Sequence, residues 1–352
     1  MLMKTSIKPN IYSGHECLND FKLFIKNNNY SSIAVLVDEN TQIHCLPLLK
    51  NIFSGAHIIP TKSGERNKSI QSCQKVWKQL SDLHFDRKAL VVNVGGGVLC
   101  DMGGFIAATY MRGIDFVHIP TTLLSMCDSC IGGKLSVNMD GLKNQIGLFS
   151  PPCAIVIYPE FLETLPEKQI LSGFAEVIKH ALVADKRFFK ELLLLTDFKN
   201  NLDKTIFHSI KIKTRLVNLD IFETGIRKSL NFGHSIGHAI ETYSIIKDND
   251  NPVSHGEAIA AGMIAASWIS YRRNLLTLNE LSQISDYILR FFPKLKINEE
   301  IIPVIMENIK KDKKNEYDHI LFTLLDGIGQ FRVNQEVKRE EILQALKYYI
   351  SL

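Results

Sequence analysis

The chain has 352 residues, of which 45% are hydrophobic, so it is long enough and apolar enough for two well-packed domains. Its formal net charge of +4 is too small to suggest a nucleic-acid partner. Residues 1–10 contain lysines but no apolar core, so we expect no signal peptide, and the apolar run 258–269 is too short to span a bilayer. Seven scattered cysteines suit a reducing compartment, and we expect a cytoplasmic protein.

Up to about residue 160, short β-rich runs alternate with segments of helical spacing. The runs lie at 32–37, 57–59, 89–94, 116–119 and 154–157, and helical spacing occurs at 69–80 and after Gly97. This alternation predicts a Rossmann-like α/β domain over residues 1–160, with a mostly parallel sheet and helices on both faces.

Beyond Phe161 the strand signal nearly disappears. Helical periodicity then dominates, at 170–183, 188–195, 205–220 and 279–290. A short apolar run at 320–325 is compatible with a small hairpin or a late strand. We therefore expect a second, all-α domain over residues 161–352.

A glycine-rich motif follows the apolar run 89–94 directly and opens a helical segment, Gly95-Gly-Gly-Val-Leu-Cys-Asp101-Met-Gly-Gly104. Adjacent glycines let the backbone approach a pyrophosphate closely, and the amides of a helix N-terminus supply donors. The motif differs from the G-x-G-x-x-G fingerprint, and a plain glycine turn after a strand is common. Asp38 and Asn40 can serve a ribose, although a loop Asp-x-Asn is more often turn chemistry.

Cys127 and Cys130 form a C-x-x-C pair just before Gly132 and Gly133. A redox pair or half of a zinc site is one interpretation. Because the chain has no second C-x-x-C, we favour two small residues filling space beside a glycine loop.

Basic and amide side chains gather in the stretch between residues 112 and 144, at Arg112, Lys134, Lys143 and Asn144. Lysines beside glycines in loops are natural phosphate ligands, although any one of them can simply be exposed. Further on, Glu176 and Lys179 lie three residues apart on one helical face. That spacing also describes a surface ion pair, but the apolar neighbours indicate a buried helix.

Three histidines follow in the second half of the chain. His234 and His238 are four residues apart, so they share a helical face, and His255 can supply a third nitrogen to one metal ion. Ser235 stands where a zincin motif carries its general-base Glu. Packed or solvent-facing histidines are the alternative, but the neighbouring Arg227, Asn231, Glu241 and Glu257 would be costly to bury without a ligand.

The motifs as a set resemble the 3-dehydroquinate synthase family, within the sugar-phosphate cyclase superfamily. Besides the glycine motif, the resemblance runs through Tyr110-Met-Arg-Gly113, Pro120-Thr-Thr-Leu-Leu124, Asp128, Gly132-Gly-Lys134, Lys143-Asn144, Ala175-Glu-x-x-Lys179, Glu223-x-x-x-Arg227-x-x-x-Asn231-x-x-His234-x-x-x-His238, His255-Gly-Glu257 and Asp312-Lys-Lys314. It covers the chain from about Asp38 to Gly329. Each motif is weak alone, but their combination in this order is specific.

The resemblance implies an NAD- and zinc- or cobalt-dependent lyase of aromatic amino-acid biosynthesis. The family converts 3-deoxy-D-arabino-heptulosonate 7-phosphate to 3-dehydroquinate and phosphate. It oxidises a ring hydroxyl with NAD, eliminates phosphate, reduces the ketone, opens the ring and closes a carbocycle by aldol addition. It further implies a cytoplasmic homodimer with an NAD-binding first domain and a metal- and substrate-binding second domain, and neither a nucleic-acid nor a membrane partner.

Residue roles also follow from the resemblance, position by position. The metal ligands would be Glu176, His234 and His255, and His238 would handle a proton. The substrate phosphate would be bound by Lys134, Asn144, His238, Lys313 and Arg112 of the partner subunit. The ring hydroxyls and carboxylate would be bound by Asp128, Lys179, Lys213, Arg227 and Asn231. NAD would be bound by Asp38, Asn40, Glu65, Lys68, Gly95, Gly96, Gly97, Val98, Asp101, Thr121, Thr122, Asp128, Lys134, Lys143, Phe161, Thr164 and Leu165.

Some positions depart from the family pattern, namely Leu135, Gln169 and Ile221, together with a longer insert at 247–252. Three alternatives stay open. A sugar-phosphate cyclase of another specificity would carry other residues at some of the positions Asn231, His238 and Lys313. A metal-dependent, NAD-linked polyol dehydrogenase would have no use for the anion-binding cluster, and a zinc-structured binding protein would unfold without its metal.

Overall fold

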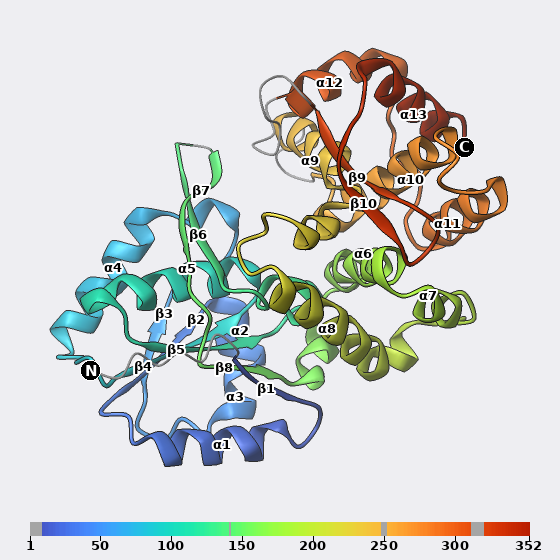
Figure 1. Cartoon of the computed structure of the whole chain (residues 1–352). Helices are drawn as coiled ribbons and strands as arrows, with labels where there is room; N and C mark the ends of the chain where they lie inside the picture. Colours follow the sequence, from blue (N-terminus) through green and yellow to red (C-terminus); the bar gives the residue numbers. More distant parts are fainter. Residues whose placement is uncertain (1–8, 141, 248–251, 311–319) are drawn as a thin grey trace. The chain divides into compact units, whose positions relative to one another are not determined.

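The computed structural model describes residues 9–140, 142–247, 252–310 and 320–352 (Figure 1). The chain divides into two compact units, residues up to Pro166 with Leu202–Ile210, and Glu167–Asn201 with Lys211–Leu352. The expected functional boundary at residue 160 stays a prediction. Among the described residues, no helix combines the length and the apolar character needed to cross a membrane.

The first unit is built on a parallel sheet of six strands, as the alternating pattern predicts. From one edge to the other the strands are β1 (Asn10–Ser13), β8 (Ala154–Ile157), β5 (Asp115–Pro120), β4 (Leu90–Gly95), β2 (Ile33–Val37) and β3 (His57–Pro60). The four inner strands are apolar and almost entirely buried because both faces of the sheet are covered there, whereas the edge strands β1 and β3 are largely exposed.

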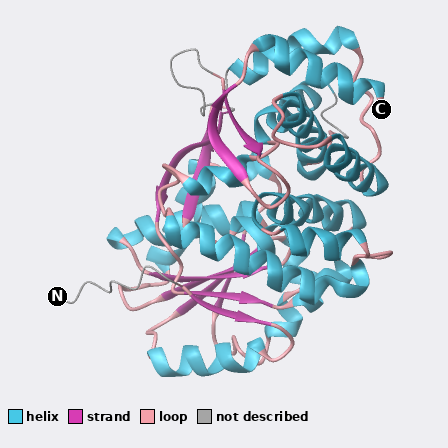
Figure 2. Ribbon diagram, turned by 45° about the vertical axis from the view of Figure 1, so that its right-hand side comes forward, coloured by secondary structure: helices cyan, strands magenta, loops and turns pink. Residues whose placement is uncertain are grey.

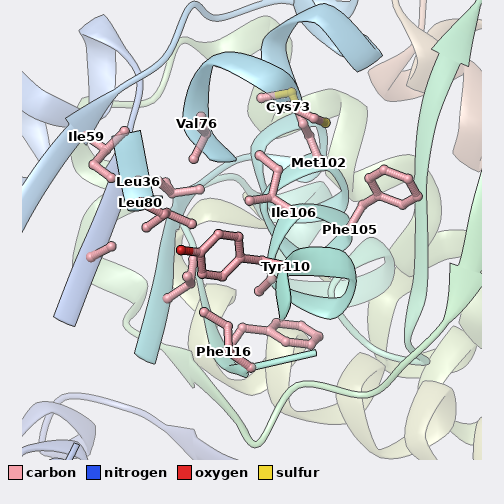
Figure 3. Close-up of a cluster of buried hydrophobic side chains, with 14 of the residues drawn as sticks. Leu36, Ile59, Cys73, Val76, Leu80, Met102, Phe105, Ile106, Tyr110 and Phe116 are labelled. Carbon is pink, nitrogen blue, oxygen red and sulfur yellow. The ribbon is translucent and has the colours of Figure 1, made fainter. Parts of the chain in front are cut away.

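Helices α4 (Ile70–Asp82) and α5 (Gly97–Thr109) lie over one face of the sheet, and α1 (Cys17–Asn28) lies over the other (Figure 1). Figure 3 shows the core between the sheet and helices α4 and α5. Leu36 and Phe116 reach it from strands, whereas Val76 and Ile106 reach it from α4 and α5. Burying each such side chain contributes about 1.5–3 kcal/mol of transfer free energy, which holds the two helices on the sheet.

The strand order reverses between β2 and β4. The chain runs outward from β2 to β3, returns to β4 on the opposite side of β2, and continues outward through β5 and β8. A crevice forms outside the carboxyl ends of strands at such a switch point, and ligands bind there. The ends of β2 and β4 are followed by Asp38 and by the glycine motif.

The connections of this unit are short helices and one hairpin, which the sequence did not predict. The helices are α2 (Glu39–His44), α3 (Leu46–Leu49), η1 (Glu65–Asn67), η2 (Tyr110–Arg112), η3 (Ser125–Ser129) and η4 (Pro159–Thr164). The hairpin pairs β6 (Lys134–Met139) with β7 (Leu142–Phe149) in antiparallel register. Cys127 and Cys130 are both buried near η3, as expected if they fill space.

The second unit is mainly helical, as the periodicity predicts (Figure 2). The expectation of an all-α domain needs one correction, because the apolar run at 320–325 forms a strand of an antiparallel pair. The elements are α6 (Glu167–Ala184), α7 (Lys186–Leu193), η5 (Lys199–Asn201), η6 (Ile226–Asn231), α9 (His234–Lys247), α10 (His255–Arg272), α11 (Leu278–Phe291), η7 (Glu299–Ile301), α12 (Ile302–Lys310), β9 (Leu321–Leu325), β10 (Phe331–Glu336) and α13 (Arg339–Ser351). Helix α8 (Leu202–Leu219) has residues in both units.

Candidate active site

Helices α9 and α10 cross with their backbones in contact, and glycines make this approach possible. A Cβ at Gly262 would lie 2.0 Å from the carbonyl oxygen of Gly233, and a Cβ at Gly237 would lie 3.0 Å from the carbonyl oxygen of Ala258. Gly233 also has φ +79°, which suits glycine in the turn that begins α9. The histidines at the starts of α9 and α10 are therefore carried on two helices that cannot separate without losing this packing.

The start of α10 is fixed against α6. Ser254 caps the helix in a reciprocal capping box with Glu257, so α10 begins at His255. The Gly256 amide donates to Ser172 Oγ at 3.0 Å, and a Cβ at Gly256 would lie 2.3 Å from the Cα of Ser172. This contact brings His255 to the face of α6 that carries Glu176.

Glu176, His234 and His255 place one potential ligand atom each within 4.8 Å of one another. His234 Nε2 and His255 Nε2 lie 3.6 Å and 3.4 Å from Oε1 of Glu176. The Glu176 carboxylate is completely buried, and Lys179 forms an ion pair with its other oxygen. One carboxylate and two imidazoles form the donor set of a catalytic divalent-metal site with an open position.

The second nitrogen of each imidazole has an acceptor that orients the ring. His255 Nδ1 lies 3.1 Å from Glu241 Oε2, and His234 Nδ1 lies 3.1 Å from the carbonyl oxygen of Phe232. Such contacts hold the other nitrogen toward a metal. Burial lowers the pKa of His255, but hydrogen bonds to Glu176 and Glu241 and their negative charges outweigh burial and raise the pKa to about 9.

A second group of potential ligands shares His255 with the first. His238, Glu241 and His255 also place ligand atoms within 4.8 Å of one another. The rings of His234 and His238 are 5.1 Å apart, so α9 offers two neighbouring imidazoles to the same region. These two groups, which lie wholly within the second unit, therefore offer two overlapping positions for one ion.

Cationic side chains are buried in this unit, which is unusual for residues of their type. Arg227 and Lys213 are only 1% and 6% exposed, and Lys179 is 1% exposed. Arg227 Nε lies 3.7 Å from Glu223, whose other carboxylate oxygen accepts a 2.8 Å hydrogen bond from Asn231. Glu223 thus connects two residues expected to contact the substrate.

In the first unit, the glycine motif packs tightly at the switch point. Strand β5 holds the motif in place, since the Thr121 amide donates to the carbonyl oxygen of Gly95 at 3.0 Å. A Cβ at Gly97 would lie 2.9 Å from Ser129 Oγ, and a Cβ at Gly96 would lie 3.1 Å from Thr122 Cγ2. Larger residues would collide with these two side chains, so glycine is needed for the loop to pack this closely.

Asp38 has a structural partner, because its carboxylate caps α2 by accepting from the amides of Asn40 and Thr41. Lys68 is 3% exposed and donates to Asp101 and Asn144 at 2.6 Å each. Glu65, Lys68, Asp101 and Asn144 are thus brought together.

The other expected site residues lie in varied surroundings. Five of them are exposed, namely Lys134, Lys143, Arg112, Asn40 and Thr164. Four are half-buried, namely Val98, Thr122, Asp128 and Leu165, and two are buried, Thr121 and Phe161. Lys313 lies outside the described residues.

Several residues that shape the sites were missed by sequence reasoning. Glu241 was noted only as a polar neighbour, and Asn138 and Gly262 were not singled out. The position of Glu241, seven residues after His234 on the same helix, offered a signal for an orienting carboxylate. Contacts of Asn138 and Gly262 depend on distant segments, so no local pattern marks them.

Two family models match adjacent parts of the chain, which together span residues 58–315. The model described as 3-dehydroquinate synthase N-terminal matches residues 58–172, and the one described as 3-dehydroquinate synthase C-terminal matches residues 173–315. A protein of Parabacteroides distasonis named 3-dehydroquinate synthase is 40% identical over 331 residues, which cover 93% of each chain. The chain belongs to the 3-dehydroquinate synthase family. The resemblance inferred from the motifs is thereby confirmed, and the chain is an enzyme of this family.

Two further comparisons agree with membership of the 3-dehydroquinate synthase family. A 3-dehydroquinate synthase of Streptococcus pyogenes is 40% identical over 326 residues, covering 89% of this chain and 87% of that protein. A crystal structure of 2-deoxy-scyllo-inosose synthase, complexed with carbaglucose-6-phosphate, NAD+ and Co2+, is similar with a TM-score of 0.84. It is 26% identical to this chain, and the match covers 96% of both chains.

Proposed function

We propose that this chain converts 3-deoxy-D-arabino-heptulosonate 7-phosphate to 3-dehydroquinate and inorganic phosphate, with NAD+ and a divalent metal as cofactors. The observation that carries the proposal is the convergence of Glu176, His234 and His255 in a chain that is 40% identical to proteins named for this reaction. The related 2-deoxy-scyllo-inosose synthase, complexed with NAD+ and Co2+, supports the choice of cofactors.

The described residues fit both cofactors. Two imidazoles, which give up their extra proton when a metal binds, and one carboxylate suit Zn2+ or Co2+ and leave room for substrate oxygens. The glycine motif lies at the switch point of the sheet, where a Cβ on Gly96 or Gly97 would meet the side chain of Thr122 or Ser129. A backbone free of side chains beside a helix N-terminus suits a pyrophosphate.

Bound NAD+ supplies a reversible hydride acceptor, and the bound metal supplies a Lewis acid that makes a hydroxyl more acidic. The side chains of the second unit then hold the substrate. Buried Arg227, Lys213 and Lys179 are proposed to bind its carboxylate and hydroxyls, and Asn231 is oriented for this task by Glu223. His238 is proposed to handle a proton. Holding the substrate against bound NAD+ and these side chains can account for much of the rate, because it turns encounters between separate groups into steps within one complex.

In the first unit, Lys134 and Asn144 are proposed to bind the substrate phosphate. Lys134 is an exposed point charge at the start of β6, and Asn144 is oriented by its bond to Lys68. Binding of NAD+ is proposed for the residues at the carboxyl ends of the strands, among them Glu65, Lys68 and Asp101.

The decisive assay follows phosphate and NADH together. We expect purified protein to release phosphate from the heptulosonate phosphate without accumulating NADH, and to stop when a chelator removes the metal. A polyol dehydrogenase would instead accumulate NADH. A zinc-structured binding protein would unfold on metal removal. We expect this protein instead to keep the helical circular dichroism signal to which the second unit contributes.

Assembly and location are proposed from the same resemblance. We propose a homodimer in which Arg112 of the partner subunit completes the phosphate site, and a cytoplasmic location. Sedimentation analysis of the wild-type protein tests the dimer. Mixing Arg112→Ala protein with protein inactivated at another site tests whether activity returns through exchange of subunits.

A further inference from the structure

Asn138, near the end of β6, hydrogen-bonds to two segments of the chain, the loop at 65–68 and Asn144 in β7. Its amide N–H donates to the carbonyl oxygen of Lys68 at 2.8 Å. Its side-chain Nδ2 donates to Glu65, to the carbonyl oxygen at 3.2 Å and to Oε1 at 2.8 Å. Its side-chain Oδ1 accepts from the amide of Asn144 at 2.8 Å.

The bond to Asn144 lies where the pairing of the hairpin is irregular. The register between β6 and β7 shifts between Val137 and Met139, and Asn144 has φ +53°. Asparagine is one of the few non-glycine residues that adopt the left-handed region readily. The Asn138 side-chain oxygen accepts the amide hydrogen of Asn144 in this conformation and so helps to fix the backbone there.

The side chain of Asn144 is oriented as a consequence. Its Oδ1 accepts from Lys68 Nζ at 2.6 Å and from Ser136 Oγ at 2.8 Å. Two donors at one oxygen fix which end of the amide faces Lys68, so Nδ2 points the other way. Lys68 itself is held by the contact between its carbonyl oxygen and Asn138.

We propose that Asn138 is a positioning residue that couples the nucleotide loop at 65–68 to the phosphate ligand Asn144. The inference rests on the proposed function, which assigns NAD+ to the loop at 65–68 and the substrate phosphate to Asn144. One side-chain amide uses its donor end for the loop and its acceptor end for Asn144. Loss of that amide therefore loosens both contacts at once, although Asn138 itself is not proposed to contact NAD+ or the substrate.

Two substitutions separate the ends of the amide. Asn138→Ala removes both contacts and should weaken NAD+ binding and raise KM for the heptulosonate phosphate, each by about 5- to 50-fold. Asn138→Asp keeps an oxygen for the Asn144 amide but turns a carboxylate toward Glu65. It should weaken NAD+ binding by a similar factor while KM for the phosphorylated substrate stays within about threefold of wild type.

Direct titration of the protein with NAD+ gives a readout that does not depend on turnover, and KM and kcat complete the comparison. The matched control is Asn28→Ala, which removes an exposed amide that donates to Phe24 on α1 of the same unit. We expect the control to match wild type in NAD+ affinity and KM. Asn138→Ala protein with NAD+ affinity and KM within twofold of wild type would overturn the inference, as would an Asn138→Asp variant that changes KM as strongly as alanine does.

Amide hydrogen exchange keeps this test separate from the proposed function. If wild-type protein releases no phosphate from the heptulosonate phosphate, the proposed function fails. The coupling is still supported when Asn138→Ala accelerates exchange at both the Asn144 amide and residues 65–69. Unchanged exchange at these amides overturns it whatever the activity.

Discussion

Glu241 Oε2 lies 3.1 Å from Nδ1 of His255, and this contact turns the opposite ring nitrogen of His255 toward Glu176, 3.4 Å away. Helix α9 thus supplies both a candidate ligand, His234, and the carboxylate that orients a candidate ligand on α10. The pair also favours one tautomer of His255, with the hydrogen on Nδ1 when a metal occupies Nε2.

Removing the orienting carboxylate should weaken metal binding without removing a ligand. We expect Glu241→Ala to lower the affinity for Zn2+ or Co2+ by about 10- to 100-fold, because the His255 ring loses its orientation and its basicity. Competition with a chromogenic chelator measures the affinity. Glu340→Ala, an exposed carboxylate in the first turn of α13, serves as control and should not change it. Unaltered affinity in Glu241→Ala would show that His255 needs no partner.

The two imidazoles of α9 distinguish the overlapping metal positions. His234→Ala should lose the metal and the activity together, since it removes a proposed ligand. His238→Ala should keep the metal and lose turnover, because His238 is proposed to handle a proton. Metal content by atomic emission, measured beside phosphate release, compares the two. The reverse pattern would place the ion among His238, Glu241 and His255.

The close crossing of α9 and α10 predicts that a single methyl group can disturb the metal site. In Gly262→Ala the new Cβ would be 2.0 Å from the carbonyl oxygen of Gly233, so the helices must move apart. We expect a loss of about 3 kcal/mol in unfolding free energy, together with weaker metal binding. Urea titration and chelator competition measure the two effects. Ala266→Gly, on the same helix, lowers helix propensity and removes one buried methyl group without adding an atom, so it should cost about 2 kcal/mol and leave metal affinity unchanged.

The architecture could be predicted because its signals are local. Alternating short apolar runs indicate a parallel sheet, and helical periodicity marks the second unit. The hairpin of β6 and β7 escaped prediction because β7 is mostly exposed, and its inward-facing apolar residues, Ile146 and Leu148, are too few to mark a strand. The strand at 321–325 was visible as an apolar run. In its partner, β10, half-buried residues alternate with exposed ones, and no apolar run marks the strand.

The sites were predictable only as sets of residue types. The spacing of His234 and His238 indicates a shared helical face, but it cannot choose which histidine faces Glu176. That choice depends on the backbone crossing at Gly262 and on the α6 contact at Gly256, which join segments far apart in sequence. Likewise, the support that Asn138 gives to Asn144 depends on a register shift within a hairpin that the sequence did not reveal.

An ion pair between α10 and α13 should make stability depend on pH in the acid range. Arg273 donates to both oxygens of Glu341 at 2.7 Å and to the carbonyl oxygen of Glu336 at 2.7 Å. The guanidinium, helped by the Lys338 amide, lowers the pKa of Glu341 below its ordinary value of 4.5, although partial burial opposes this.

Because the pKa is lower in the folded state, the pair stabilises the fold fully above about pH 4.5 and loses this effect as pH falls through the folded-state value. Arg273→Ala should therefore lower the unfolding free energy by about 1 kcal/mol at pH 7, and by progressively less below pH 4.5. Urea unfolding of both proteins at several pH values measures the difference. Lys347→Ala, which removes an exposed pair with Glu299 at 3.5 Å, should cost at most about 0.5 kcal/mol at any pH. A constant loss for Arg273→Ala across the acid range would mean that packing of the arginine, and not its charge, provides the stabilisation.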